Sequence, residues 1–407
     1  QLVYDIAVNK HENLFFTGSA GTGKSHVLLK IIVALKKIYG TEKVAVTAMT
    51  GIAAVNISGT TLHSFAGIGL GTESTEKLIE KIKKSKIHYL QWKSIKALVI
   101  DEVSMLDGGL FDKLDTIAQA IRNNHRLFGG ILLIVTGDFF QLLPVSKDCN
   151  IKFCYESNSW TKCINHMIQL STVFRQKESD FIGILNEIRL GIVTEKTLEI
   201  MNRLKLPPQY PDDGIHVTEL YSKIDKVTSA NLVFLSKIQN KPYIYHAKDY
   251  EPEKIGQLKT LIKGCLAPDK LELKRGAQVM LIKKINNDLV NGSRGVIVGF
   301  YSKDTRKSYY DGEDEIVEFG QKDEILPIVK FTENRKLIVH KAEWRLETVG
   351  NVVSASRQQG QTLERVKIDL KEVFEKGQAY VALSRAKSLE SLQVLNFARE
   401  KIMVHDK

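Results

Sequence analysis

The chain has 407 residues, which allows about two to four domains and an ample buried core. A hydrophobic fraction of 43% and a charged fraction of 26% are ordinary for a soluble globular protein. The 58 Lys and Arg residues outnumber the 47 Asp and Glu residues, and the net charge of +11 is expected of a protein that binds a polyanion. Charge alone leaves open a basic enzyme that binds no nucleic acid. No apolar run reaches about 18 residues, so the sequence predicts no membrane span.

The four cysteines do not make a disulfide framework and fit a reducing compartment. Cys149, Cys154 and Cys163 lie near His166, but no Cys-x-x-Cys pair occurs, so core thiols are favoured over a zinc site. The chain opens at Gln1 with no charged or apolar leader. We therefore expect no signal peptide, and a core taken from a longer protein.

The first 170 residues alternate between strand-length apolar runs and helical patterns. Helical periodicity covers 24–39 and 110–123, and the apolar runs that predict buried strands are 14–17, 43–48, 97–100 and 131–136. This alternation predicts a parallel sheet with helices on both faces. The stretch 67–96, rich in Ser, Lys and Gly, breaks the rhythm and is expected to be a small excursion from the sheet.

A different pattern follows residue 174. A helical run at 180–190 precedes a proline-bearing break at 207–211. Short β-type runs then predict a small antiparallel barrel or sheet, at 278–283, 295–300, 315–319, 325–331 and 336–346. Strands at 366–369 and 393–395 return to the α/β style. The expected domains are 1–165, a second α/β domain made of 166–274 and 348–407, and a β insertion at 275–347.

One segment has the pattern G-x-x-x-x-G-K-[ST] between a predicted strand and a predicted helix, which is the context of a P-loop. Its residues are Gly18, Ser19, Ala20, Gly21, Thr22, Gly23, Lys24 and Ser25. The glycines let backbone N–H groups surround phosphates, and the helix N-terminus adds its dipole. Lys24 would reach the β- and γ-phosphates, and Ser25 would hold Mg²⁺. A plain glycine-rich turn does not explain the Lys-Ser pair.

Two acids end the apolar strand at 97–100. Asp101 fits the Mg²⁺ ligand at the strand tip, and Glu102 fits the base that orients the attacking water. No Asn-Lys-x-Asp motif for guanine follows, so ATP is favoured over GTP. Gln141, after the next strand, is a candidate γ-phosphate sensor, with a polar turn residue as the alternative.

Two arginines, Arg175 and Arg385, lie far downstream. Phosphoryl transfer needs positive charge on the transferring group, and in motor ATPases a second domain commonly supplies it. From the residues alone, a surface salt bridge is the simpler interpretation of either arginine.

The whole motif set resembles the PIF family of superfamily 1 helicases. The matching segments are 47–54, 61–69, 101–106, 112–122, 137–144, 173–176, 276–280, 289–293 and 377–386, in the family's order. Gln1 lies where the family's adenine-reading glutamine falls. The resemblance covers nearly the whole chain and is far more specific than the P-loop alone.

The resemblance implies two RecA-like domains with parallel sheets, 1A and 2A, with a small 1B wedge and an SH3-like insertion, 2B. It implies an ATP site between 1A and 2A, with Arg175 and Arg385 as arginine fingers. It also implies a 5′-to-3′ DNA helicase that moves on single-stranded DNA and unwinds duplexes, forks, RNA–DNA hybrids and G-quadruplexes. A monomer that maintains the genome in the nucleus and mitochondrion, in replication, repair and at telomeres, is the corresponding expectation.

The sequence departs from the family at motif V. The family's strand and Ile-His-Lys-Ser-Gln-Gly-Gln-Thr-Leu pattern would precede Gly360, but the segment 354–359 runs directly into it, with about fourteen residues of the pattern missing. Either this junction marks a break in the sequence, or the strand is absent. In the second case DNA-coupled hydrolysis should be badly impaired.

DNA contacts are expected from basic and flat side chains. His63 and Phe65 are candidates for base contacts, with core packing as the alternative for Phe65. Further candidates are Thr50, Asn291, Gly360 and Thr362. The lysine run 81–86, with Tyr89 and Trp92, is a candidate duplex contact or simply a solvated helix face.

Two other functions compete with the helicase. A DNA-stimulated P-loop ATPase acting as a clamp or remodeller would share the P-loop and the Asp-Glu pair but would not need two distant arginines. A nucleotide kinase fits the length and the β insertion poorly. DNA-stimulated hydrolysis separates the first two from the kinase, and strand displacement separates the helicase from the clamp.

Overall fold

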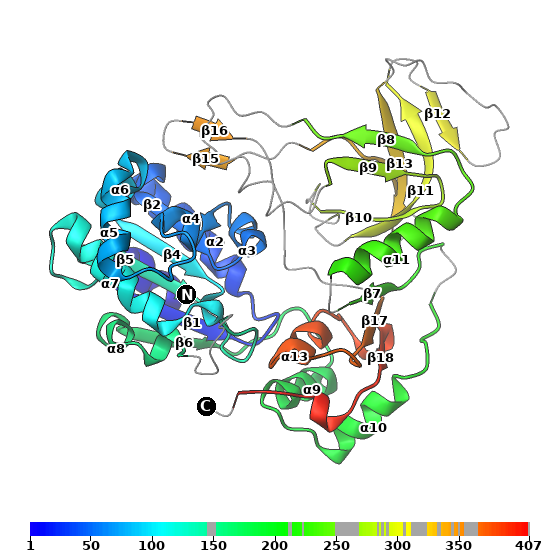
Figure 1. The fold of residues 1–407 in the computed structure, drawn as a ribbon. Coiled ribbons are helices and arrows are strands. Elements are labelled where there is room, and N and C mark those ends of the chain that lie inside the picture. Colours follow the sequence, from blue (N-terminus) through cyan, green and yellow to red (C-terminus); the bar gives the residue numbers. More distant parts are fainter. Residues whose placement is uncertain are drawn as a thin grey trace.

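The computed structural model describes residues 1–144, 152–210, 214–221, 224–248, 268–282, 285, 289, 293–303, 307–310, 324–331, 335–342, 346–348, 351–353 and 365–405. Two α/β units and a β module follow one another in space (Figure 1). Among these residues, no helix is both long enough and apolar enough to cross a membrane.

The first α/β unit is built on a six-stranded parallel sheet with the order β3-β2-β4-β5-β1-β6. The strands are β1 (Leu14–Gly18), β2 (Val44–Ala48), β3 (Thr60–Thr61), β4 (Ala97–Asp101), β5 (Leu132–Thr136) and β6 (His166–Leu170). Side chains alternate between two cores, one on each face: Leu98 and Ile100 join one, and Ala97 and Val99 join the other. Both faces are therefore covered, as the near-continuous apolar strands predict.

Helices cover both faces of this sheet. The predicted helix 24–39 is α2 (Lys24–Tyr39), and the predicted helix 110–123 is α7 (Gly108–Arg122). Asp107 caps α7 by accepting from the Leu110 N–H at 3.1 Å, which explains the earlier start. The shorter elements of this unit are α1 (Leu2–Tyr4), η1 (Asp5–Lys10), η2 (Thr41–Lys43), α3 (Gly51–Asn56), η3 (Val103–Met105), η4 (Leu127–Gly130), η5 (Cys154–Glu156) and α8 (Asn158–Cys163).

The expected excursion at 67–96 is a pair of helices packed on the sheet. After α4 (Leu62–Ala66), α5 (Thr75–Lys84) and α6 (Lys86–Ser94) lie beside α7 (Figure 1). Trp92 is fully buried, and its indole N–H donates to the Ala66 carbonyl at 3.1 Å. Trp92 is therefore a core residue and not a DNA contact.

The strand β6 extends the first unit beyond the boundary expected at residue 165. All five of its residues pair with β1 in parallel, from His166 with Leu14 to Leu170 with Gly18. The residues of β6 alternate between half-buried and exposed, as is usual for an edge strand. The weak apolar pattern explains why the sequence did not predict this strand.

The second α/β unit contains a parallel sheet with the order β18-β17-β7. Its strands are β7 (Thr218–Leu220), β17 (Val366–Asp369) and β18 (Leu392–Leu395). The packed helices are α9 (Ser179–Arg189), α10 (Glu195–Arg203), α13 (Gln378–Leu383), η7 (Leu389–Ser391) and η8 (Arg399–Lys401). Because β7 pairs directly with β17, the β module interrupts this unit in sequence. The motif V segment, 354–364, lies outside the described residues.

The β module is antiparallel. Its main sheet has the order β10-β11-β13-β14, with β12 paired to β11. The strands are β10 (Gln278–Met280), β11 (Arg294–Ser302), β12 (Lys307–Tyr310), β13 (Ile325–Phe331) and β14 (Lys336–Ile338), and a separate hairpin joins β15 (Leu346–Thr348) to β16 (Asn351–Val353). The run expected at 315–319 lies outside the described residues.

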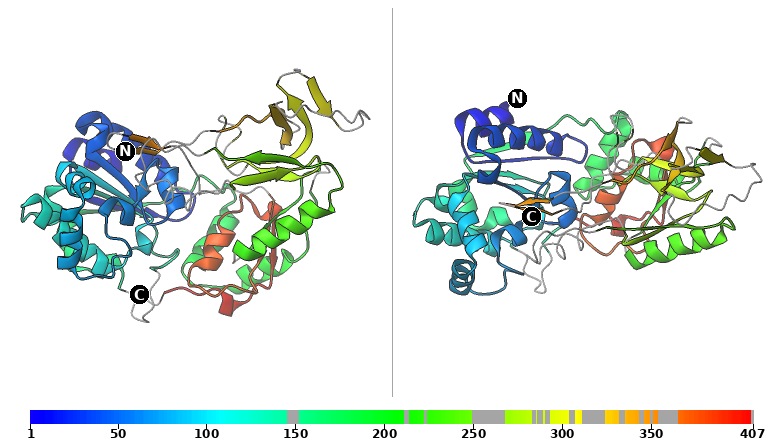
Figure 2. Two further views of the ribbon diagram at one scale, coloured as in Figure 1. Left: turned by 45° about the horizontal axis from the view of Figure 1, so that its top comes forward. Right: turned by 90° about the horizontal axis from the view of Figure 1, so that it is seen from above.

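Segments from before residue 275 join this module. Leu235 of α11 (Ile224–Lys237) packs on its core, and β8 (Tyr243–His246) pairs with β9 (Lys270–Leu273). The centre of the Tyr243 ring lies 3.9 Å from the centre of the Phe300 ring in β11. In the ribbon views of Figure 2 the green segments lie beside the yellow strands. The module therefore includes residues that the sequence division placed in the second α/β domain.

Candidate functional site

The P-loop follows β1 and leads into α2. Gly21 and Gly23 have φ values of +84° and +83°, a conformation that favours glycine. A Cβ on Gly21 would also meet the Cβ of Arg175 at 2.7 Å, so this glycine allows a close approach of the second unit. The Lys24 ammonium donates to the carbonyls of Gly18 at 2.7 Å and Ser19 at 3.2 Å. Lys24 is thereby held against the P-loop, which is expected to bind the phosphates of a nucleotide together with it.

Three carboxylates surround Lys24. Burial lowers the pKa of Lys24, while the negative charges of Asp138, Glu102 and Asp101 act in the opposite direction. Asp101 is the last residue of β4, Glu102 follows it, and Asp138 follows β5. The carboxyl ends of β4 and β5 lie on the same sheet edge as that of β1. This shared edge brings together residues that are more than seventy positions apart in sequence.

Asp101, which is buried, and Glu102, which is half-buried, form an acidic pair at the end of β4. Asp101 accepts a hydrogen bond from the Glu102 N–H at 2.9 Å, and Glu102 has a left-handed backbone with φ of 54°. Burial, together with the charge of Glu102, raises the pKa of Asp101 to about 7. Burial also raises the pKa of Glu102, and Lys24 and Arg385 oppose that rise. A nearby cation would stabilise both acids in their charged form.

This pair fits a Mg²⁺ ion in its chemistry. Mg²⁺ prefers hard oxygen ligands and is often held by one or two carboxylates together with substrate phosphates. Asp101 supplies a carboxylate, and Ser25, on the first turn of α2, supplies an exposed hydroxyl. Within the described ranges, no group of three or more His, Cys, Asp or Glu residues is arranged to hold a metal ion. Cys154 and Cys163 are buried free thiols, and Cys149 lies outside those ranges.

The second unit delivers both arginines to this edge. The guanidinium of Arg175 donates to the Ser384 carbonyl at 3.0 Å, next to Arg385. Burial, and then the charge of Arg385, lowers the pKa of Arg175 to about 10. The charge of Glu102 acts to raise the pKa of Arg385, which burial lowers, so these two side chains interact across the unit boundary. Among the described residues neither arginine forms a salt bridge, so the surface salt-bridge interpretation is not supported.

The helix α13 of the second unit also contacts the first unit at this edge. The Tyr380 hydroxyl accepts a hydrogen bond from the Ala20 N–H of the P-loop at 2.8 Å. Gly377, with φ of +77°, lies so close to the Gln141 carbonyl that a Cβ would come within 2.4 Å of that oxygen. The buried amide of Gln176 donates to the carbonyls of Ser384 at 3.1 Å and Ala386 at 2.8 Å. Loops from both units are therefore held against each other by specific contacts.

A buried ion pair joins the two units beside this helix. Arg189, at the end of α9, donates to Asp138 through two nitrogens, at 2.7 and 3.1 Å. Asp138 is fully buried, and the Arg189 guanidinium lies 4.2 Å from the centre of the Phe140 ring. Gln141 donates to the same carboxylate at 3.3 Å, so it contacts the interdomain ion pair. Sequence reasoning assigned no role to Asp138 or Arg189, although Asp138 lies in the matched segment 137–144 and directly follows an apolar strand.

The candidate DNA contacts have mixed outcomes. Phe65 is only 7% exposed and packs 5.2 Å from the Trp92 ring, so it belongs to the core, the alternative interpretation, and is not available for base stacking. His63 is half-buried, and burial lowers its pKa. The Thr50 hydroxyl accepts from the Ala53 N–H at 3.2 Å, as a cap of α3. Asn291, Gly360 and Thr362 lie outside the described residues.

Two other predicted contacts lie at the surface. Gln1 is exposed, and its side chain caps no backbone group of α1. The lysine run 81–86 lies at the end of α5 and the start of α6, and Lys81 pairs with Glu73 at 3.0 Å. The run has the character of a solvated helix face.

Comparison with known proteins agrees with this geometry. The PIF1-like helicase family model matches residues 1–199, and the model of the 2B domain of DNA helicase Pif1 matches residues 258–300. The ATP-dependent DNA helicase PIF1 of Emericella nidulans is 42% identical over all of this chain and 61% of its own length. Its human counterpart is 38% identical over 96% of this chain and 59% of its own length. The chain thus spans about 60% of the length of these relatives.

A solved structure matches this chain over nearly its own whole length. The crystal structure of Pif1 helicase from Candida albicans is 39% identical, covers 100% of this chain and 97% of the other, and has a TM-score of 0.74. Its likeness confirms the α/β fold with two RecA-like units and added antiparallel strands. The chain belongs to the PIF1-like helicase family.

Proposed function

We propose that this chain is an ATP-dependent DNA helicase that moves 5′ to 3′ on single-stranded DNA. The observation that carries the proposal is the division of one site between two units. Lys24, Asp101 and Glu102 come from the first unit, whereas Arg175 and Arg385 come from the second. An ATPase that completes its site only when two units meet can convert hydrolysis into relative motion of those units.

Each residue has a role that its surroundings support. The P-loop amides and Lys24 bind the β- and γ-phosphates, while Ser25 and Asp101 would hold Mg²⁺, which would neutralise phosphate charge. Glu102 orients the attacking water and accepts its proton. Arg175 and Arg385 stabilise charge on the transferring phosphoryl group. Gln141 links the nucleotide side of the first unit to the ion pair with Arg189.

The interface gives hydrolysis a mechanical consequence. The Tyr380–Ala20 hydrogen bond and the Asp138–Arg189 ion pair both cross between the units. We expect phosphate binding to tighten these contacts and product release to loosen them, with each cycle moving the DNA strand a short step. The units correspond to 1A and 2A, the helical pair α5–α6 to a 1B wedge, and the β module to 2B.

The substrates follow from the family. The named relatives are DNA helicases, so single-stranded DNA and duplex forks are the proposed partners, with RNA–DNA hybrids and G-quadruplexes as further substrates. His63 and Thr50 stay in the proposed DNA path, together with Asn291, Gly360 and Thr362. A monomer acting in the nucleus and mitochondrion completes the proposal.

Strand displacement tests this function. Duplexes that carry a single-stranded tail at either the 5′ or the 3′ end are incubated with the chain and ATP, and the displaced strands are measured. Unwinding that requires the 5′ tail and ATP supports the proposal. ATP hydrolysis stimulated by DNA without any displacement would instead identify a clamp or remodeller. Hydrolysis indifferent to DNA would contradict both.

A further inference from the structure

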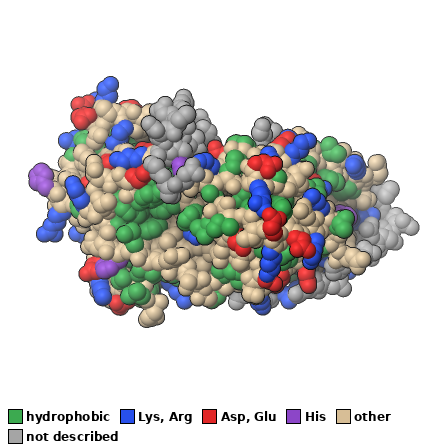
Figure 3. All heavy atoms as spheres, turned by 90° about the horizontal axis from the view of Figure 1, so that it is seen from below, with side chains coloured by type: hydrophobic (Ala, Val, Ile, Leu, Met, Phe, Trp, Pro, Cys, Tyr) green, Lys and Arg blue, Asp and Glu red, His purple; other side chains and the backbone are tan. Residues whose placement is uncertain are grey.

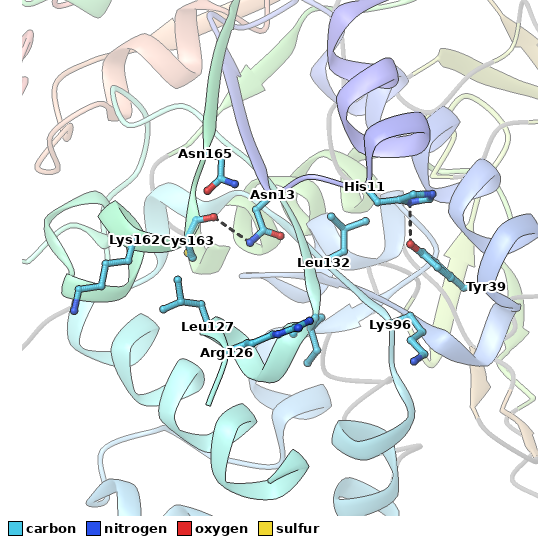
Figure 4. A pocket seen from close by; sticks show the side chains of 12 residues that line it. His11, Asn13, Tyr39, Lys96, Arg126, Leu127, Leu132, Lys162, Cys163 and Asn165 are labelled. Atoms are coloured by element: carbon cyan, nitrogen blue, oxygen red, sulfur yellow. Dashed lines mark hydrogen bonds between the residues drawn. The ribbon is translucent and has the colours of Figure 1, made fainter. Parts of the chain in front are cut away.

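A cavity of about 450 Å³ opens at the edge of the first sheet opposite the ATP site (Figure 4). Its lining residues Asn13, Lys96 and Asn165 immediately precede β1, β4 and β6, and Leu132 begins β5. The P-loop and Asp101 stand at the other ends of these strands. A five-residue strand spans about 16 Å, so a ligand in this cavity would not contact the nucleotide.

The lining is basic and carries no compensating acid. Lys96, Arg126 and Lys162 contribute side chains, and none of the lining residues is Asp or Glu. Within the part of the chain that the structure describes, these three side chains form no ion pair or hydrogen bond. Arg126 lies across the middle of the cavity in Figure 4, with Lys96 and Lys162 toward opposite sides. Their charges therefore spread along the opening instead of converging on one point.

The wall behind these cations is fixed by polar contacts. Asn13 donates to the Cys163 carbonyl at 3.0 Å and accepts from the Leu133 N–H at 2.8 Å. The Tyr39 hydroxyl and His11 Nδ1 are 2.8 Å apart (Figure 4). The centres of the two rings lie 5.6 Å apart, and the ring planes are tilted by 51°. A rigid wall with uncompensated cations in front of it concentrates positive potential toward solvent. On the face in Figure 3, by contrast, basic and acidic side chains are intermixed.

We propose that this cavity binds a phosphodiester strand of nucleic acid, as a second contact apart from the motor path. A single phosphate is usually enclosed by converging donors, as at the P-loop, whereas spaced cations suit successive phosphates. Peptide partners are usually anchored by buried aromatic or aliphatic side chains. The aliphatic residues of this lining are Leu127, Ile131 and Leu132, and the hydroxyl of its one tyrosine, Tyr39, is held by His11. The choice of nucleic acid over an acidic protein rests in part on the proposed function.

The test is the salt dependence of DNA binding. The affinity of the whole chain for a single-stranded oligonucleotide is measured over a range of salt concentrations, for the parent and for the triple variant Lys96→Gln, Arg126→Gln and Lys162→Gln. Each phosphate contact contributes about 0.7 to the slope of log affinity against log salt for single strands. Loss of three contacts should reduce that slope by about 2, and each single substitution by about 0.7. Basal ATP hydrolysis should not change.

A matched control removes three exposed lysines that lie outside the cavity lining: Lys30→Gln, Lys77→Gln and Lys205→Gln. This variant should keep the parent slope. An equal fall in the control would attribute the effect to net charge and overturn the proposal. An unchanged slope in the cavity variant would also overturn it and turn attention to an acidic protein partner. A parent that binds no oligonucleotide would contradict the proposed function itself, which is a distinguishable result.

Discussion

The two α/β units contribute to the ATP site in different ways. The first has a six-stranded sheet with apolar cores on both faces, and it holds the P-loop and both acids at one edge. The second has three parallel strands among its described residues, and it contributes arginines, a tyrosine and a tight helix contact. Binding chemistry is thus built into one unit, and completion of the site depends on the other. The predictions below separate these contributions.

Loss of the first unit's chemistry should have the largest effect. Lys24→Ala removes the phosphate ligand, and Glu102→Gln removes the base, so each should reduce ATP hydrolysis by about 10³-fold or more and abolish unwinding. Because Glu102 acts in chemistry and not in affinity, Glu102→Gln should still bind ATP in a nucleotide-binding assay, whereas Lys24→Ala should bind it weakly. Unwinding retained by either variant would refute the site assignment.

Loss of the second unit's arginines should lower turnover with little change in affinity. Arg385→Ala, and separately Arg175→Ala, should reduce kcat by about 10³-fold while KM for ATP changes little, because fingers act on the transition state. Steady-state kinetics with saturating DNA provides the measurement. Arg203→Ala serves as the control and should behave as the parent, because Arg203 is exposed and pairs with Glu199 of the same helix. A rise in KM without loss of kcat would make these arginines ordinary binding residues.

The buried ion pair should contribute both stability and coupling. Arg189→Ala leaves Asp138 buried without its partner, which costs about 3–5 kcal/mol at such sites. We expect a lower unfolding temperature and weaker stimulation of hydrolysis by DNA. The double variant Arg189→Ala with Asp138→Asn should recover part of the stability, since no charge is then stranded, but not the stimulation. Equal stability of the single and double variants would show that the pair is not coupled.

The smallest expected effect concerns Asp101 and pH. The folded pKa of about 7 exceeds the ordinary value of 3.8, so this group favours folding most at low pH and loses that contribution as pH rises through 7. Without nucleotide, Asp101→Asn should therefore stabilise the chain at pH 8 by about 1 kcal/mol or more, while abolishing hydrolysis. Thermal unfolding at pH 5 and pH 8 measures this difference. A variant less stable than the parent at pH 8 would show that the carboxylate is not strained.

The sequence predicted local features well and long-range contacts poorly. The P-loop and the acids after β4 are defined by short spacing and by strand direction, and the structure places them together. Asp138 lies in the matched segment 137–144, but Arg189 is 51 positions away and belongs to no matched segment, so nothing in the sequence joined the two. Phe65 and Trp92 show a second limit: the same aromatic residues serve DNA stacking and core packing, and only their burial decides.

Element boundaries show a third limit. The strand β6 is an edge strand with exposed positions, so its apolar signal was too weak to assign it to the first sheet. The helix α11 and strand β8 precede the β module in sequence, but their contacts with its core place them in that module. Such assignments depend on which surface is buried by which neighbour, and a single sequence does not contain that information.

The most direct test of the divided site is ATP hydrolysis by this chain with and without a single-stranded oligonucleotide. The account predicts strong stimulation by DNA, because strand binding should hold Arg175 and Arg385 against the P-loop and Glu102. Basal hydrolysis that DNA leaves unchanged would contradict it, and would mean that the two units do not complete the site together.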